Sequence, residues 1–254
     1  MIGTQERQRL RNILEQDRLW TAYALADLDP NYAEGSNWLV EEDAVILHYI
    51  GLEPPVLFLH GPSESLAQRI EEIPPGRVQF MVRAPNRPLL MQYLQPDFEV
   101  EMWRMALDLA RFTPPSETEC RPLGPEDLSA ITSLTADHPD RPDAFSEYQL
   151  AHGVFFGYWL EDRLVAMAGT HVLSEMMDVA AIGNVFTDPA HRGQGYGTAV
   201  SAAVTRELVE REIGTIVLNV AKDNRPAVAV YENLGFWPVY GYYEGVGIIK
   251  TPTQ

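Results

Sequence analysis

The sequence predicts a mixed α/β protein, of the α+β kind, whose sheets are mostly antiparallel and flanked by helices. Three observations lead to this prediction. The chain has 254 residues, of which 46% are hydrophobic and 22% charged, which is typical of a globular protein with one large or two medium domains. Short β-prone apolar runs alternate with helical patterns along its whole length. A Pro-rich polar stretch at 111–120, which contains Pro114-Pro115, divides this pattern into two parts.

The first part is predicted to form a domain over residues 1–114. It opens with a helical pattern over residues 5–26, which ends before Asp29-Pro30 because proline does not continue a helix. Apolar runs and helical spacing then predict, in order, strands at 37–43, 44–50 and 54–61, a helix at 64–73, a strand at 77–84, a short helix after Asn86 and a strand at 98–107.

The second part is predicted to form a domain over residues 115–254. It begins with a strand at 120–123 and helices at 125–136 and 143–153. The remaining pattern predicts strands at 154–162, 163–173 and 178–186, a helix at 198–212 with Thr198 as its N-cap, a strand at 214–220, a helix at 226–234, and two final strands at 235–243 and 246–250.

The loop between the strand at 178–186 and the helix at 198–212 carries three glycines at alternate positions, Gly193, Gly195 and Gly197. Glycine permits a close approach of the backbone to a ligand, and a helix N-terminus presents unpaired N–H groups and the positive end of a dipole. Such a loop predicts an anion site, with phosphate as its usual guest. The loop lacks the lysine of a nucleotide P-loop and fails the dinucleotide fingerprint G-x-G-x-x-G.

Composition narrows the possible partners and location. The net charge of −17 argues against a nucleic-acid partner, whose phosphates would be repelled, and is compatible with a cationic substrate. The single cysteine, Cys120, excludes an internal disulfide framework and a Cys-based metal cluster, and no metal is expected. No apolar run reaches eighteen residues and no signal-peptide pattern opens the chain, so we expect a cytoplasmic protein without a membrane partner.

Two motifs resemble those of the GNAT superfamily of acyl-CoA-dependent N-acyltransferases. The first is R-x-x-G-x-G, formed by Arg192, Gly195 and Gly197 in a strand–loop–helix setting. The second is NRPAVAVYENLGF at 224–236, which fits N-x-x-A-x-x-x-Y-x-x-x-G-F. The resemblance covers about residues 118–250, and the loop is also similar to that of glycine N-acyltransferase-like members.

The resemblance implies a set of cosubstrate contacts and one catalytic residue. Tyr231 matches the usual general acid, which would hold or protonate the departing CoA thiolate. Backbone N–H groups near Val185 would stabilise the developing oxyanion. The residues expected to bind acetyl-CoA are the pantetheine segment Val185, Phe186 and Thr187, the pyrophosphate loop Arg192, Gly193, Gln194, Gly195, Tyr196, Gly197 and Thr198, and Asn224, which is otherwise a helix cap.

The general base departs from the family pattern. Many relatives carry a Glu on the strand before the loop, where this chain has Ala180-Ala181, and others carry one on the next strand, where the nearest polar residue is Asn219. The amine would then lose its proton to water, or to His171, Glu175 or Asp178.

The expected function is direct transfer of an acetyl or other acyl group from acetyl-CoA to a primary amine, with a small molecule as the acceptor. An acyl-enzyme on Cys120 is not expected. Two alternatives stay open, an acetyltransferase for a protein N-terminus or lysine and a non-catalytic acyl-CoA sensor, whereas a nucleotide-binding oxidoreductase fits poorly because the fingerprint fails. The acceptor, the preferred acyl length and the oligomeric state have no signal in the sequence.

An internal similarity links the two parts of the chain. NRPLLMQYLQPDF at 86–98 shares five residues with NRPAVAVYENLGF at 224–236 at a constant offset of 138, and the order of predicted elements around both segments is the same. We therefore expect the first domain to be a degenerate GNAT-like copy that packs against the second and walls the acceptor site. Its loop HGPSES at 60–65 lacks the alternating glycines, and Pro62 removes an amide donor, so one CoA per chain is expected.

Overall fold

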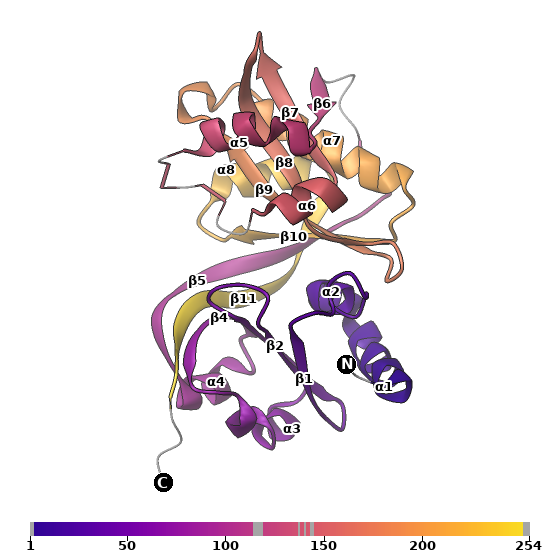
Figure 1. Ribbon diagram of the computed structural model, residues 1–254, viewed down its shortest axis with the longest axis vertical. Coiled ribbons are helices and arrows are strands. Elements are labelled where there is room, and N and C mark those ends of the chain that lie inside the picture. The colour runs from indigo at the N-terminus through magenta and orange to yellow at the C-terminus, as the bar shows by residue number, and fades with distance from the viewer. Residues whose placement is uncertain (1–2, 114–118, 137, 140, 143–144, 251–254) are drawn as a thin grey trace. The chain divides into compact units, whose positions relative to one another are not determined.

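In the computed structural model the chain forms two compact units (Figure 1). The structure describes residues 3–113, 119–136, 138–139, 141–142 and 145–250, so Pro114-Pro115 lies outside the described residues. The first unit comprises Met1–Arg104, Val220–Asp223 and Pro238–Gln254, and the second comprises Met105–Asn219 and Asn224–Trp237. Each unit is a mixed α/β body with a mostly antiparallel sheet, which confirms the predicted fold class.

The first unit holds a sheet in the order β1-β2-β3-β4-β11-β5. The pairs β1–β2, β2–β3 and β4–β11 are antiparallel, and β3–β4 is parallel. Its strands are β1 (Ser36–Glu41), β2 (Ala44–Tyr49), β3 (Val56–His60), β4 (Gly76–Arg83), β5 (Leu94–Leu107) and β11 (Phe236–Ile249). Its helices are α1 (Thr4–Leu14), α2 (Arg18–Ala26), α3 (Ser63–Ala67) and α4 (Arg87–Tyr93), with 3₁₀ turns η1 (Glu15–Asp17) and η2 (Ile70–Glu72).

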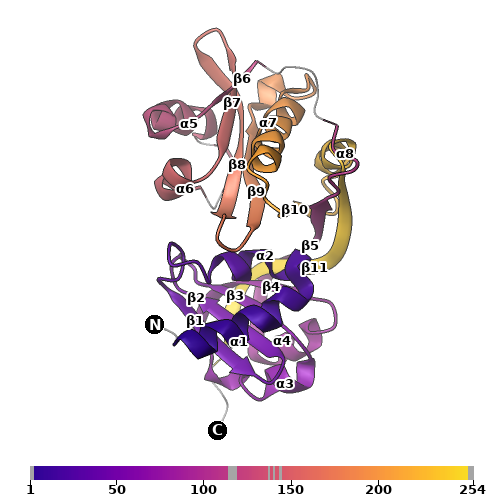
Figure 2. The ribbon, with the colours of Figure 1, turned by 90° about the vertical axis from the view of Figure 1, so that its right-hand side faces the viewer.

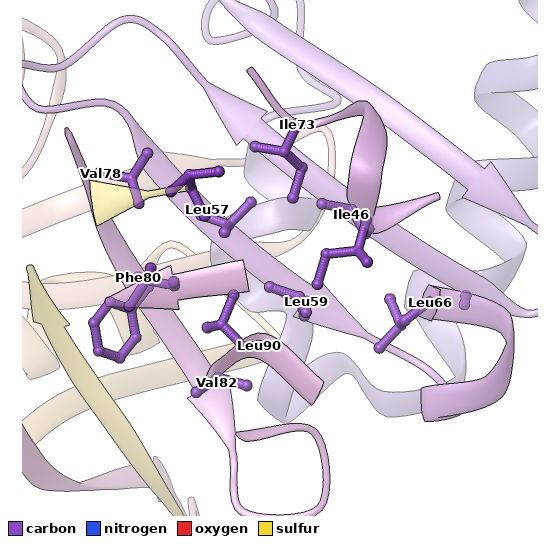
Figure 3. Packing of buried hydrophobic residues seen from close by; sticks show 13 residues of the cluster. Ile46, Leu57, Leu59, Leu66, Ile73, Val78, Phe80, Val82 and Leu90 are labelled. Atoms are coloured by element: carbon purple, nitrogen blue, oxygen red, sulfur yellow. The ribbon is translucent and has the colours of Figure 1, made fainter. Parts of the chain in front are cut away.

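Successive residues of β3 point to opposite faces of this sheet, and both faces are buried. Leu57 and Leu59 point into a core that also contains Leu66 of α3 and Leu90 of α4, as Figure 3 shows. Phe58 faces the opposite side, where its ring centroid lies 5.3 Å from that of Trp20 on α2. The near-continuous apolar run VLFLH of β3 is therefore a strand covered by helices on both faces.

The second unit holds strands in the order β10-β9-β8-β7-β6, antiparallel except for the parallel pair β9–β10. Helices α5 and α6 cover one face of this sheet and α7 covers the other (Figure 2). Its strands are β6 (Cys120–Pro122), β7 (Phe155–Leu160), β8 (Arg163–Ser174), β9 (Val179–Thr187) and β10 (Thr215–Ala221). Its helices are α5 (Leu128–Thr135), α6 (Glu147–His152), α7 (Tyr196–Glu210) and α8 (Arg225–Asn233), with 3₁₀ turns η3 (Pro125–Asp127) and η4 (Pro189–His191).

The same succession of elements occurs twice along the chain. In the first half it is β3-α3-β4-α4, and in the second it is β9-α7-β10-α8, with a parallel strand pair in each case. The repeated order expected from the 138-residue offset is therefore present. The two units interleave in sequence, however, because Pro238–Gln254 belong to the first unit, where residues 242–249 of β11 pair with β4. The division at 114/115 stays a prediction about the two sequence halves.

Two local predictions were wrong. The final strands expected at 235–243 and 246–250 form one continuous strand, β11. Gly245 lies inside this strand and allows close packing against β5, because an added Cβ would meet the carbonyl oxygen of Phe98 at 2.2 Å. Thr198 is not an N-cap, because the glycine loop itself turns into the helix. Gly195 is the N-cap, with φ of +87°, and α7 begins at Tyr196.

Candidate active site

The parallel pairing of β9 with β10 covers only the first part of β9. The register runs from Val179↔Thr215 to Ile182↔Leu218. The rest of β9 pairs on its other edge with β8, where Phe186 lies opposite Met167 and Thr187 opposite Ala166. In the described register, the β10-side edge of 185–187 is therefore not used for strand pairing. An extended amide-bearing chain such as pantetheine can form strand-like hydrogen bonds along such an edge.

The glycine loop has the backbone geometry that its sequence predicts. Gly193 and Gly195 adopt φ angles of +76° and +87°, which L side chains rarely take. A Cβ added at either glycine would meet nothing within 4 Å, so the loop presents bare backbone to open space. Since α7 has fifteen residues and starts directly after Gly195, the N–H groups of its first turn and the helix dipole favour an anion there. The loop therefore fits a pyrophosphate group.

Polar side chains brace this loop from both ends. The carboxylate of Asp188 accepts from the N–H of Ala190 at 2.9 Å and pairs with Arg163, and the Ala190 hydrogen bond is the main cause that holds the pKa of Asp188 below its usual range. Arg192 Nε donates to the carbonyl of Thr187 at 3.3 Å, and the hydroxyl of Tyr196 donates to Gln194 at 3.2 Å. The backbone of the loop is thus held before any ligand binds.

Tyr231 lies on α8 and is 8% exposed. Burial raises the pKa of its phenol to about 12, so the hydroxyl stays protonated at neutral pH. Its ring packs edge-on against Phe236 at a centroid distance of 6.1 Å. A buried, protonated phenol fits the role of a proton donor.

Asn224 caps α8. Its side-chain oxygen accepts from the N–H of Ala227 at 3.3 Å, as expected for an N-cap. The Oδ1 atom therefore has a structural role, and a cosubstrate contact would use the Nδ2 group.

Two of the three candidate bases are engaged in structural contacts. Asp178 adopts a φ of +57° and accepts the N–H of Gly214 at 2.5 Å, which ties the β8–β9 turn to the start of β10. Glu175 is mostly exposed and lies 3.8 Å from the guanidinium of Arg211. These contacts favour a structural role for both carboxylates.

His171 is placed differently, against the backbone of β9. Its Nε2 accepts from the N–H of Asn184 at 3.2 Å, and a Cβ on Gly183 would meet that nitrogen at 2.2 Å, so glycine is needed for the ring to lie there. Burial lowers the pKa of His171 to about 4, which keeps the imidazole neutral at neutral pH. With so low a pKa, His171 is a poor proton acceptor and is better suited to positioning.

Sequence reasoning missed two residues of this region, Gln149 and Asn184. Asn184 lies on β9 directly before Val185, has a φ of +52° and is 3% exposed. Its Nδ2 donates to Gln149 Oε1 on α6 at 3.2 Å across 35 residues of sequence. No local sequence pattern marks such a pair.

Three further observations concern the remaining predictions. Cys120 lies on β6, where it is paired with Tyr158 of β7. Among the described residues, no group of three or more His, Cys, Asp or Glu is arranged to hold a metal ion. No helix in the described ranges has both the length and the apolar character needed to cross a membrane.

Comparison with known sequences finds similarity in the second half of the chain. Residues 125–236 match the Acetyltransferase (GNAT) family. The chain is 38% identical over 88 residues to a mycothiol acetyltransferase of Catenulispora acidiphila, covering 32% of this chain and 28% of that protein. It is 36% identical over 70 residues to the ribosomal protein bS18-alanine N-acetyltransferase of Escherichia coli K12, covering 28% and 47%. The chain thus spans less than half of each relative.

Solved structures extend the likeness to both units at the level of fold. A GNAT-family protein from Novosphingobium aromaticivorans superposes with a TM-score of 0.64 at 19% identity, covering 91% of this chain and 97% of that one. A tandem GNAT protein from the clavulanic acid biosynthesis pathway gives 0.61 at 12% identity, covering 97% and 96%. The predicted tandem architecture fits the latter.

Proposed function

We propose that the chain, whose residues 125–236 match the Acetyltransferase (GNAT) family, transfers an acetyl group from acetyl-CoA directly to a primary amine of a small molecule. The observation that carries the proposal is the loop of Gly193 and Gly195, whose left-handed backbone and open space precede the N-terminus of α7. This loop and the unpaired edge at 185–187 provide adjoining contacts for a pyrophosphate and an amide-bearing arm.

The chain's own residues have separate tasks in the transfer. The nitrogen of a neutral amine attacks the thioester carbonyl, and N–H groups of β9 near Val185 stabilise the charge that develops on its oxygen. As the tetrahedral intermediate collapses, the C–S bond breaks and Tyr231 gives its phenolic proton to the sulfur. The ammonium proton passes to water, since Glu175 and Asp178 are engaged elsewhere and the pKa of His171 is low. Tyr231 regains a proton from water, which restores the phenol for the next turnover.

The class of acceptor distinguishes the proposal from its alternatives. The names of the two relatives describe one small-molecule and one protein acetyltransferase. Thiol release should be measured with purified protein, acetyl-CoA and either a panel of small primary amines or peptides with free N-termini and lysines. We expect small amines to accelerate release. Acceleration by peptides alone would favour a protein acceptor, and CoA binding without release in any mixture would indicate a sensor.

A Cys120→Ala variant should keep its acetyl-transfer activity, within about twofold of the wild type. The mechanism has no covalent intermediate, and Cys120 lies on β6, which β7 and β8 separate from β9 in the sheet order. Steady-state thiol release measures this. Loss of transfer in the folded variant, together with an acetylated Cys120 detected by mass spectrometry in the wild type, would contradict the direct mechanism.

One molecule of acetyl-CoA should bind per chain. The corresponding loop of the first unit borders a cavity of about 500 Å³ but does not present an open run of amides, because Pro62 has no N–H and a Cβ on Gly61 would meet Ala44 Cα at 2.6 Å. Asn86 does not cap α4 but bonds this loop, accepting from Ser63 at 2.7 Å and donating to the carbonyl of Gly61 at 3.0 Å. Calorimetry should give a stoichiometry near one, whereas a value near two would refute the assignment of the first half as degenerate.

A further inference from the structure

The amide cluster, defined here as Gln149, His171 and Asn184, has one orientation that the backbone determines. Gln149 Nε2 donates to the carbonyl of His171 at 3.0 Å, and its Oε1 accepts from the N–H of Ser146 at 3.1 Å. A carbonyl can only accept and a backbone N–H can only donate, so the oxygen and nitrogen of the Gln149 side chain cannot be exchanged. Ser146 and Gln149 also form the capping box that starts α6, which fixes the base of the cluster.

This orientation in turn fixes Asn184. Because Gln149 presents its oxygen, the group of Asn184 that faces it must be the donor Nδ2, at 3.2 Å. The backbone N–H of Asn184 donates to His171 Nε2 at 3.2 Å, and its φ of +52° is one that asparagine tolerates better than most residues. The side-chain oxygen, Oδ1, is left as the free end of the amide.

Asn184 is only 3% exposed, and its buried Oδ1 atom has no hydrogen-bond partner among the described residues. A buried acceptor without a donor destabilises a protein, because it has lost its hydrogen bonds to water without gaining others. Buried polar atoms left in this way point to a functional partner or a trapped water. The atom can only accept, so its partner must bring an N–H or O–H group.

We propose that Oδ1 of Asn184 binds an N–H of the acceptor amine and thereby orients it for attack, an inference that rests on the proposed acetyl transfer. Asn184 directly precedes Val185, the first residue of the segment assigned to the thioester-bearing arm. The neutral imidazole leaves the amide cluster without a positive charge that would repel an incoming ammonium group. The cluster orients the amine and does not deprotonate it.

A binding experiment tests the proposal without catalysis. L-alaninamide, benzylamine and 1,4-diaminobutane are titrated into ¹⁵N-labelled protein saturated with CoA, and the side-chain amide signals of Asn184 are followed. We expect at least one amine to shift them. In Asn184→Gly, which suits the positive φ but removes the oxygen, the Kd of that amine should rise about fivefold to tenfold, the effect of one hydrogen bond. In Asn184→Asp, which keeps an oxygen acceptor but loses the donor to Gln149, the Kd should rise less than in Asn184→Gly.

The affinity for acetyl-CoA shows whether the N–H group that binds Oδ1 of Asn184 comes from the amine or from the cosubstrate. Thermal unfolding checks that both variants fold. The Kd of acetyl-CoA should be unchanged in Asn184→Gly while the KM of the amine rises with its Kd. A weakened affinity for acetyl-CoA would assign the oxygen to the cosubstrate arm and overturn the proposal. Unaltered amine affinity in Asn184→Gly, or no shift with any amine, would also overturn it and leave a buried water as the partner. Amine binding without thiol release in the wild type would instead contradict the proposed function alone.

Discussion

Replacing Gly195 with glutamate should abolish measurable binding of acetyl-CoA. The residue has a φ of +87° and forms the N-cap of α7, and the space where its side chain would project is open. A glutamate there would strain the left-handed backbone, occupy the space assigned to the pyrophosphate and place a negative charge against it. Calorimetric titration with acetyl-CoA measures the effect, which we expect to be a loss of about a hundredfold or more in affinity, since several phosphate contacts are lost together.

A matched control tests whether the loss of affinity depends on the position of the new side chain in the loop, rather than on any added charge and backbone strain. Gly76 begins β4 in the first unit, has a φ of +152° and likewise has nothing within 4 Å of an added Cβ. Gly76→Glu adds the same charge at an open glycine and should leave the affinity for acetyl-CoA unchanged. Equal affinity in Gly195→Glu and the wild type would refute the loop as the phosphate site.

The glycine loop was predictable because the required backbone conformation restricts the residue type. The φ angles of Gly193 and Gly195 are positive, and a helix starts directly after Gly195. Such a backbone favours glycine, so the conformation can be recognised from the sequence. The motif with Asn224 and Tyr231 is similarly local, since an N-cap and a buried residue on the same short helix are seven positions apart. Each motif lies within a single strand–loop–helix unit, which explains why a linear sequence pattern identifies it.

Contacts between distant segments left no such imprint. The pairing of β11 with β4 joins Tyr242–Ile249 to Gly76–Arg83, and nothing in either segment specifies the other as its partner. The hydrogen bond from Asn184 to Gln149 likewise depends on how α6 packs against β8 and β9. The sequence pattern predicted two separate strands at 235–243 and 246–250, whereas Gly245 lies between them in one continuous strand and packs closely against β5.

The expected effect of Tyr231→Phe is a fall in turnover of about 10²-fold to 10⁴-fold, the range for loss of a general acid. The substitution removes the proton that would go to the departing sulfur and keeps the ring that packs against Phe236. The affinity for acetyl-CoA should be nearly unchanged, because the contacts that we propose for the pyrophosphate and the pantetheine lie on the glycine loop and β9. Single-turnover measurement of thiol release reports the chemical step directly and avoids product release as the limiting step.

The pH profile provides an independent test of the same assignment. Burial raises the pKa of Tyr231 to about 12, so the phenol is protonated below that value and loses its proton only as the pH rises through it. Between pH 7 and about 10 the wild-type rate should therefore rise as more amine becomes neutral, with no falling limb from Tyr231. As a control, Tyr242→Phe removes another buried tyrosine hydroxyl, in the first unit, and should keep the wild-type rate in a folded protein. If Tyr231→Phe retains the wild-type single-turnover rate across this pH range, the thiolate leaves without help from Tyr231 and the catalytic assignment is wrong.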